Sequence, residues 1–244
     1  MKKTIFFLIS LSVLCMDLNA QFFMEGQLDI GTSQLSDGLY SQISHFGFFE
    51  KPYWGARAGY QLGLVQPQNV FFNSWYGSSY GKIPIGKTRL ILGGEYLWTA
   101  ISKDLRETNC IMFVRTTLSH WKLGLGNNTR VYRLSNKAVK DDKVIYPGNK
   151  IIEPGNLMYN VSYVLKPYEN KWNLMATITN YDHFIIQQET NPMMNIRFDY
   201  KLSGPFTLYS EVWCKSAGLL NIRVNYFGTF IRLGVIWEAG KKSV

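Results

Sequence analysis

The chain has 244 residues, of which 46% are hydrophobic and 15% aromatic, and its formal net charge is +9. The basic residues are interspersed among apolar ones and form no basic block, which argues against a nucleic-acid partner. The cysteines are isolated and the three histidines are scattered, so the composition indicates no metal, redox group or other cofactor.

The N-terminal stretch MKKTIFFLISLSVLCMDLNAQ has the pattern of a secretory signal peptide. Lys2 and Lys3 precede an apolar run, and the small residue Ala20 offers a cleavage point before Gln21. The apolar run is about 12 residues long, whereas a membrane-spanning helix needs roughly 20. We therefore expect a signal peptide at 1–20 that directs secretion across the inner membrane, followed by one mature domain at 21–244.

Beyond residue 20, polar and apolar side chains alternate along most of the chain, which is the period of a β-strand with one wet and one apolar face. The stretch NIRFDYKL, residues 195–202, alternates without exception. About 12 strands are predicted, and 10 to 14 would fit the length. In chain order they are 22–32, 54–64, 70–76, 88–99, 110–118, 121–133, 156–166, 172–179, 195–202, 205–215, 220–226 and 231–237.

The eight prolines are expected between the strands or at their ends, because a proline cannot donate to a sheet ladder. The segment 33–53 is predicted to be a long loop after the first strand. The charged connection 135–156 is a candidate lumenal plug or docking loop, with a plain loop as the alternative.

The lengths of the connections leave a conflict. If both termini face the periplasm, long and short connections should alternate regularly. The loop 33–53 fits, but 119–120 and 203–204 are then short on the outer side, while 135–155 and 182–193 are long on the inner side. Either the strand count is off by one, or the barrel presents its larger segments inward.

A membrane barrel is favoured over a soluble sandwich for two reasons. Twelve long strands in an open sheet would leave exposed edges, which closure removes. The apolar faces also carry aromatic residues near the strand ends, as in the girdles that sit at membrane interfaces. The predicted interface residues are Trp54, Trp98, Trp121, Trp172 and Trp237.

The resulting prediction is an all-β protein, a transmembrane antiparallel up-and-down β-barrel with lipid outside and charge inside. Cations outnumber anions on the polar faces, and a narrow lumen with low-dielectric walls would then favour anions. The alternative is that these charges pair across strands and fill the interior. The predicted lumen-lining residues are Arg57, Arg89, Arg115, Arg197, Asp199, Lys201, Arg223 and Arg232.

By this pattern the chain resembles the outer-membrane β-barrel proteins of Gram-negative bacteria over nearly all of its mature length, although no motif names a specific family. The LNAQ cleavage region is similar to signal peptides of the Bacteroidota type. The resemblance implies an outer-membrane location, with outer-membrane lipids and other envelope proteins as the partners to consider. The chain departs from many such barrels in that seven residues follow Trp237, where an aromatic often ends the last strand.

Three functions are considered. The leading hypothesis is a narrow passive channel with anion preference, and the alternative is a non-conducting accessory or scaffold subunit of an outer-membrane complex. The least favoured is an outer-membrane lipid hydrolase. His45 and His120 each follow a serine directly, but neighbouring residues of a strand point to opposite faces, and His183 is read as an ordinary histidine at the rim. The sequence therefore predicts no enzyme.

Overall fold

A computed structural model describes residues 21–33, 39–65, 71–86, 88–135, 150–165, 171–186, 192–215 and 227–239. The predicted signal peptide 1–20, the predicted strand 220–226 with Arg223, and most of the candidate plug lie outside these residues. No helix in the described part of the chain is long and apolar enough to cross a membrane.

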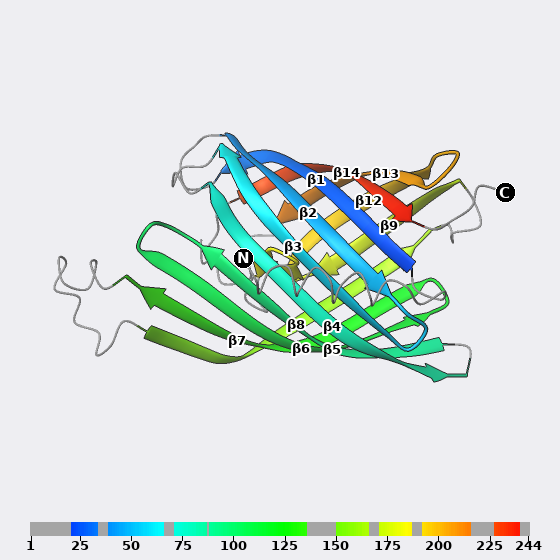
Figure 1. Cartoon of the computed structure of the whole chain (residues 1–244), viewed down its shortest axis with the longest axis horizontal. Helices are drawn as coiled ribbons and strands as arrows, with labels where there is room; N and C mark the ends of the chain where they lie inside the picture. Colours follow the sequence, from blue (N-terminus) through cyan, green and yellow to red (C-terminus); the bar gives the residue numbers. More distant parts are fainter. Residues whose placement is uncertain are drawn as a thin grey trace, which may run out of the picture.

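Twelve antiparallel strands close into one barrel (Figure 1). Each strand pairs with its neighbours along the chain, and β1 pairs with β14 to complete the cylinder. The predicted fold class is therefore confirmed. The barrel strands are β1 (Gln21–Ser33), β2 (Leu39–Glu50), β3 (Trp54–Val65), β4 (Phe72–Ile85), β5 (Thr88–Ala100), β6 (Leu105–Leu118), β7 (Trp121–Leu134), β8 (Lys150–Val164), β9 (Trp172–Thr179), β12 (Met193–Lys201), β13 (Phe206–Lys215) and β14 (Phe227–Ala239).

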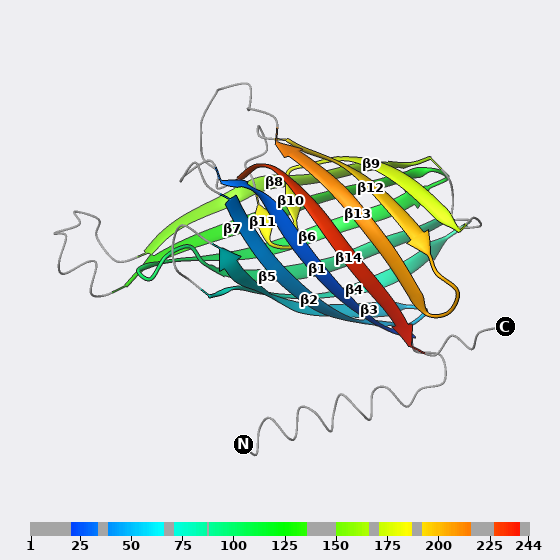
Figure 2. The ribbon, with the colours of Figure 1, turned by 90° about the horizontal axis from the view of Figure 1, so that it is seen from above.

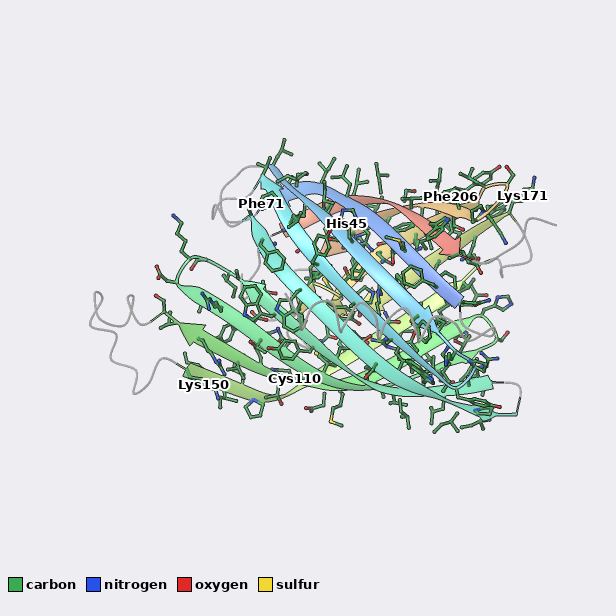
Figure 3. The ribbon with its side chains drawn as sticks, viewed as in Figure 1. His45, Phe71, Cys110, Lys150, Lys171 and Phe206 are labelled. Carbon is green, nitrogen blue, oxygen red and sulfur yellow. The ribbon has the colours of Figure 1, made fainter. Side chains whose placement is uncertain are left out.

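The two faces of the wall differ as the alternation predicts, and side chains project from both (Figure 3). In β12, Ile196 and Phe198 are exposed on the outer surface, whereas Asn195 and Asp199 are buried inside the barrel. Most barrel strands are 9 to 15 residues long, which is enough for a tilted strand to cross the hydrocarbon of a bilayer. The outer surface is thus apolar at membrane depth, and the polar residues line the interior.

The prediction of a long loop at 33–53 is wrong, because residues 39–50 form strand β2. Around residue 46 the usual pattern of this strand is inverted. Phe46 is buried inside the barrel, while His45 and Gly47 lie on the outer face. An apolar side chain that faces inward has no place in a simple water-filled lumen, so the strand could not be recognised from its alternation.

The missing strand resolves the conflict over connection lengths, since the count was off by one beyond residue 33. The short connections 51–53, 86–87, 119–120, 165–171 and 202–205 all lie at the end of the barrel that holds both chain ends, called here the terminal end. The three longest connections, which join β7 to β8, β9 to β12 and β13 to β14, lie at the opposite end, together with the four-residue connection 101–104. The total of twelve barrel strands agrees with the prediction, although β2 was not among the predicted strands and the predicted strand 220–226 falls outside the described residues.

Pro154 contradicts the expectation that prolines avoid strand interiors, because it lies within β8. The register between β7 and β8 shifts at this point, between Asn128 and Arg130, and Gly155 has a positive φ of 82°. A β-bulge leaves an extra residue without a ladder partner, so the missing N–H of proline costs no hydrogen bond there.

Candidate functional site

The connection from β9 to β12 turns into the barrel. Two very short strands, β10 (Tyr181–Asp182) and β11 (Ile185–Ile186), pair with each other around a turn at His183 and Phe184. Residues 180–186 are called here the lumenal hairpin, which is visible through the wall behind β1 and β14 in Figure 2. It is separate from the ladder of the barrel.

Asn180 is the point at which the chain leaves the wall. Its side-chain amide donates to the carbonyl oxygen of Leu157 at 2.7 Å and accepts from the amide of Tyr159 at 2.8 Å. The Thr179 hydroxyl donates to the Tyr159 carbonyl oxygen at 2.7 Å. These side chains replace the ladder bonds that β8 would receive from a longer β9, so that the backbone can bend inward without leaving buried groups unpaired.

Arginines from the wall hold the polar atoms of the hairpin. Arg115 of β6 donates to the Tyr181 hydroxyl at 2.9 Å, and Arg232 of β14 pairs with Asp182 at 2.8 Å. Arg57 of β3 donates to Nε2 of His183, and Arg130 of β7 donates to the carbonyl oxygen of Ile186 at 3.2 Å. The hairpin is therefore fastened to strands around much of the barrel circumference.

Apolar side chains of the hairpin pack between these polar contacts. Phe184 lies against Phe46 with ring centroids 5.1 Å apart, in a cluster with Tyr76 and Leu97. Ile185 packs on a second cluster, formed by Met193, Trp213 and Phe230. Tyr181 belongs to a third cluster, which includes Ile111, Phe113 and Met158. The inward Phe46 of β2 is thus explained, because it is part of the seat for the hairpin.

A cavity of about 490 Å³, lined by both polar and apolar side chains, lies beside the hairpin, and residues near the terminal end such as Thr117, Lys122 and Ile236 contribute to its wall. The wall includes five cationic side chains and four carboxylates. The cations are Arg57, Arg115, Lys122, Arg197 and Arg232, and the carboxylates are Glu25, Asp182, Asp199 and Glu211.

The arginines of the cavity are ion-paired. Arg57 contacts Glu25 at 2.9 Å and Arg115 contacts Glu95 at 2.6 Å. Arg197 bridges two carboxylates, Asp199 at 2.7 Å and Glu211 at 2.9 Å. Arg232 makes a bidentate pair with Asp29, at 2.7 and 2.9 Å. These ion pairs cancel most of the positive field that was predicted for the lumen from its arginines.

The structure brings together five of the predicted lumen-lining residues, because Arg57, Arg115, Arg197, Asp199 and Arg232 all contribute to the cavity wall.

The other predicted lumen residues lie elsewhere. Arg89 is exposed near the start of β5 and Lys201 is exposed at the last position of β12, both at the terminal end. Arg223 falls outside the described residues.

Four of the predicted interface tryptophans lie at the terminal end of the outer surface: Trp54, Trp121, Trp172 and Trp237. Trp98 lies towards the opposite end of β5, where it pairs with Trp75 of β4.

The hairpin residues themselves were missed by sequence reasoning. The segment YDHFII, residues 181–186, shows no sustained alternation, and the sequence predicts only a long connection at 182–193, with inward-facing segments as one open alternative. His183 is not at the rim as expected, because it lies inside the lumen between Arg57, Phe46 and Tyr76. The one available signal was this run of apolar and charged residues in a place where a connecting loop is usually polar.

Ser44 and His45, one of the serine–histidine pairs considered for lipid hydrolysis, point to opposite faces of the barrel wall. Ser44 is buried inside and accepts a hydrogen bond from Gln61 at 3.2 Å, whereas the ring of His45 lies on the outer face 5.4 Å from that of Tyr60. His120 lies in the turn between β6 and β7 and contacts the carbonyl oxygen of Val164.

No family model and no curated protein matches this chain. Among solved structures, the KdgM porin has a TM-score of 0.53 at 10% identity, over 88% of this chain and 98% of its own. The KdgM porin in complex with disordered oligogalacturonate has a TM-score of 0.51 at 11% identity, over 89% and 98% respectively. The chain therefore has the fold of the Gram-negative outer-membrane β-barrels, and at these identities the likeness concerns the fold alone.

Proposed function

We propose that this protein is a narrow passive channel of the outer membrane, constricted inside by the lumenal hairpin and with a preference for anions. The observation that carries the proposal is the cavity of about 490 Å³, with charged side chains in its wall, inside a closed barrel. A barrel of twelve strands lies between the small barrels that side chains fill and the large ones that hold an aqueous channel. The lumenal hairpin occupies part of the lumen of this twelve-stranded barrel and so narrows the passage through it.

The orientation in the membrane follows from the chain ends. A secreted chain with its N-terminus in the periplasm would place the terminal end, with its short turns, on the periplasmic side. The three longest connections and the root of the hairpin would then face outward. The cavity would form a vestibule between the hairpin and the periplasm.

The anion preference rests on positive charge at the terminal end. The five cations of the cavity wall are balanced by the carboxylates around them, which include Asp29 and Glu95 behind the wall, whereas Arg89 and Lys201 are exposed at the terminal end. Low-dielectric walls strengthen the effect of a small net charge on ions in a narrow passage. Since most arginines are paired, the preference should be modest. Among proteins of similar fold, the KdgM porin was solved with oligogalacturonate, a chain of acidic sugars.

The experiment is single-channel recording of the refolded mature protein in a planar bilayer under a salt gradient. Discrete current steps with an anion-selective reversal potential are expected. The double variant Arg89→Glu/Lys201→Glu should move the reversal potential towards cation selectivity, because both residues are exposed at the terminal end and no described strand pairing depends on their charge. The double variant Lys103→Glu/Arg106→Glu, at two exposed positions of the opposite end, is the control matched for total charge.

The second candidate is a non-conducting accessory subunit, which is favoured by how firmly the hairpin is fastened across the lumen. A silent bilayer from protein whose folding is shown by heat-modifiable gel mobility would reject the channel and support this candidate. Co-purification of envelope proteins with the barrel would then be the next measurement.

A further inference from the structure

The wall of the cavity contains buried hydrogen-bonding atoms of both kinds that have no partner in the structure. Two are acceptors, the side-chain carbonyl oxygens of Gln27 and Asn195, and each of these residues is only 6% exposed. Two are donors, Nε of Arg57 and Nδ1 of His183. All four residues line the cavity, and they come from β1, β12, β3 and the lumenal hairpin.

Neighbouring contacts fix the role of the atoms at Gln27 and His183. The amide nitrogen of Gln27 donates to Glu25 at 2.9 Å, which directs its carbonyl oxygen away from that carboxylate. Nε2 of His183 accepts from the Arg57 guanidinium, which has donors only. In the neutral imidazole the hydrogen is therefore on Nδ1, which makes that nitrogen a donor.

Because the cavity wall has both unpaired donors and unpaired acceptors, a solute that pairs with all of them must itself both donate and accept hydrogen bonds. An inorganic anion would satisfy the donors and leave the carbonyl oxygens unpaired, while a metal cation would do the reverse. A hydroxyl group both donates and accepts, so a solute with several hydroxyl groups can satisfy both sets at once. Leaving either set buried without a partner is unfavourable.

The rest of the cavity fits such a solute. Its arginines are already paired with carboxylates, so little charge is left to demand a counter-ion. Trp213 and Phe48 contribute apolar surface to the wall, against which the C–H face of a sugar ring can pack. The volume of about 490 Å³ falls within the range of roughly 300–1,000 Å³ that is typical of small-molecule sites.

We propose that this cavity is a binding site for a neutral polyhydroxylated solute of the size of a mono- or disaccharide. The inference rests on the proposed function, because the solute that binds in the cavity is taken to be one that enters the channel. It also goes further, because it names the class of solute and the residues that select it.

The test is isothermal titration calorimetry of the folded, full mature chain in detergent, with glucose and sucrose as probes and with sodium phosphate and sodium acetate for comparison. Binding of at least one of the two sugars is expected. Asn195→Leu and Gln27→Leu each remove one acceptor at similar volume, and each should weaken sugar binding by about three- to tenfold.

Asn128→Leu is the matched control. Asn128 is also buried with an unpartnered carbonyl oxygen, but it does not line the cavity. Sugar affinity should therefore be unchanged in this variant. Heat-modifiable gel mobility shows that each variant is folded, and Asn195→Asp, which keeps the acceptor, should retain more affinity than Asn195→Leu.

Two results would overturn the inference. Binding of phosphate or acetate without binding of either sugar would make the cavity an anion site, and binding of no probe would mean that these atoms face water alone. The channel proposal is judged separately by conductance. Sugar binding with a silent bilayer rejects the channel and keeps the site, while conductance without sugar binding keeps the channel and rejects the site.

Discussion

Arg232 joins the wall of the barrel to the hairpin through a buried network of charges. Its side chain is 2% exposed, makes a bidentate pair with Asp29, and reaches Asp182 of the hairpin at 2.8 Å and Glu211 at 3.5 Å. Asp29 and Asp182 thus depend on this guanidinium for their charge balance, while Glu211 also pairs with Arg197 at 2.9 Å. A buried ion pair adds little net stability over an apolar replacement, but removing one partner leaves an uncompensated buried charge.

We therefore expect Arg232→Met to destabilise the protein strongly. Leaving Asp29 and Asp182 buried without their cation should lower the free energy of unfolding by about 3–5 kcal/mol. Urea unfolding in detergent micelles, followed by tryptophan fluorescence, measures the loss. Arg106→Met, at an exposed position of β6, is the control and should change the free energy of unfolding by less than about 0.5 kcal/mol. Similar stability of the two variants would show that the Arg232 pairs are not structural.

At the scale of elements, the hairpin accounts for what is unusual in the wall. The strand β2 carries Phe46 inward because Phe184 packs on it, and β9 stops at Thr179 because the chain enters the lumen at Asn180. The pairing of β9 with β12 is continuous from Trp172 and Tyr200 to Thr179 and Met193. The twelve-stranded ladder therefore closes without the hairpin, although β9 pairs with β8 only from Asn160 onward.

Replacing residues 181–186 by a short Gly-Ser linker tests whether the hairpin is the constriction. The barrel should still fold, because its twelve-stranded ladder does not include the hairpin. Single-channel conductance should rise several-fold, since the lumen loses both the hairpin and its contacts with the wall. Replacing residues 102–104 of the connection between β5 and β6 by Gly-Ser is the control. Unchanged conductance in a folded hairpin variant would place the constriction elsewhere.

At the scale of the whole molecule, the apolar band on the outer surface decides how the barrel sits in a membrane. Leu233 is near the middle of β14 and is 49% exposed, whereas Leu202 lies in the connection after β12 at the terminal end. The cost of a charge on the outer face of a barrel is greatest at the bilayer midplane and falls towards the interface.

Leu233→Arg should accordingly lower the free energy of unfolding by roughly 2–4 kcal/mol in lipid bilayers, while Leu202→Arg should cost about 0–1 kcal/mol. Urea titration of both variants in phospholipid vesicles checks the difference. If the two substitutions had equal effects, Leu233 would not be at the midplane, and the assignment of the outer surface to lipid would have to be revised.

The sequence alone predicted the barrel because strand pairing and burial follow a local rule. In β12, the alternation of Asn195 and Asp199 with Ile196 and Phe198 is enough to predict one inner and one outer face. The polar side of such strands also indicated Arg57, Arg115, Arg197, Asp199 and Arg232, which the structure places together at the cavity. For this part of the molecule each residue's environment depends mainly on its own strand.

What only the tertiary structure decided is the interior. Phe46, Tyr76 and Leu97 lie on three different strands and face inward because Phe184, from the connection between two other strands, reaches them across the lumen. Asp182 likewise finds Arg232 some 50 residues later in the chain. A sequence pattern reports periodicity within one segment, and it contains no information about which distant segment enters the space that the strands enclose. The alternation therefore predicted the wall, while the hairpin, the cavity beside it and the pairing of its charges became visible only in three dimensions.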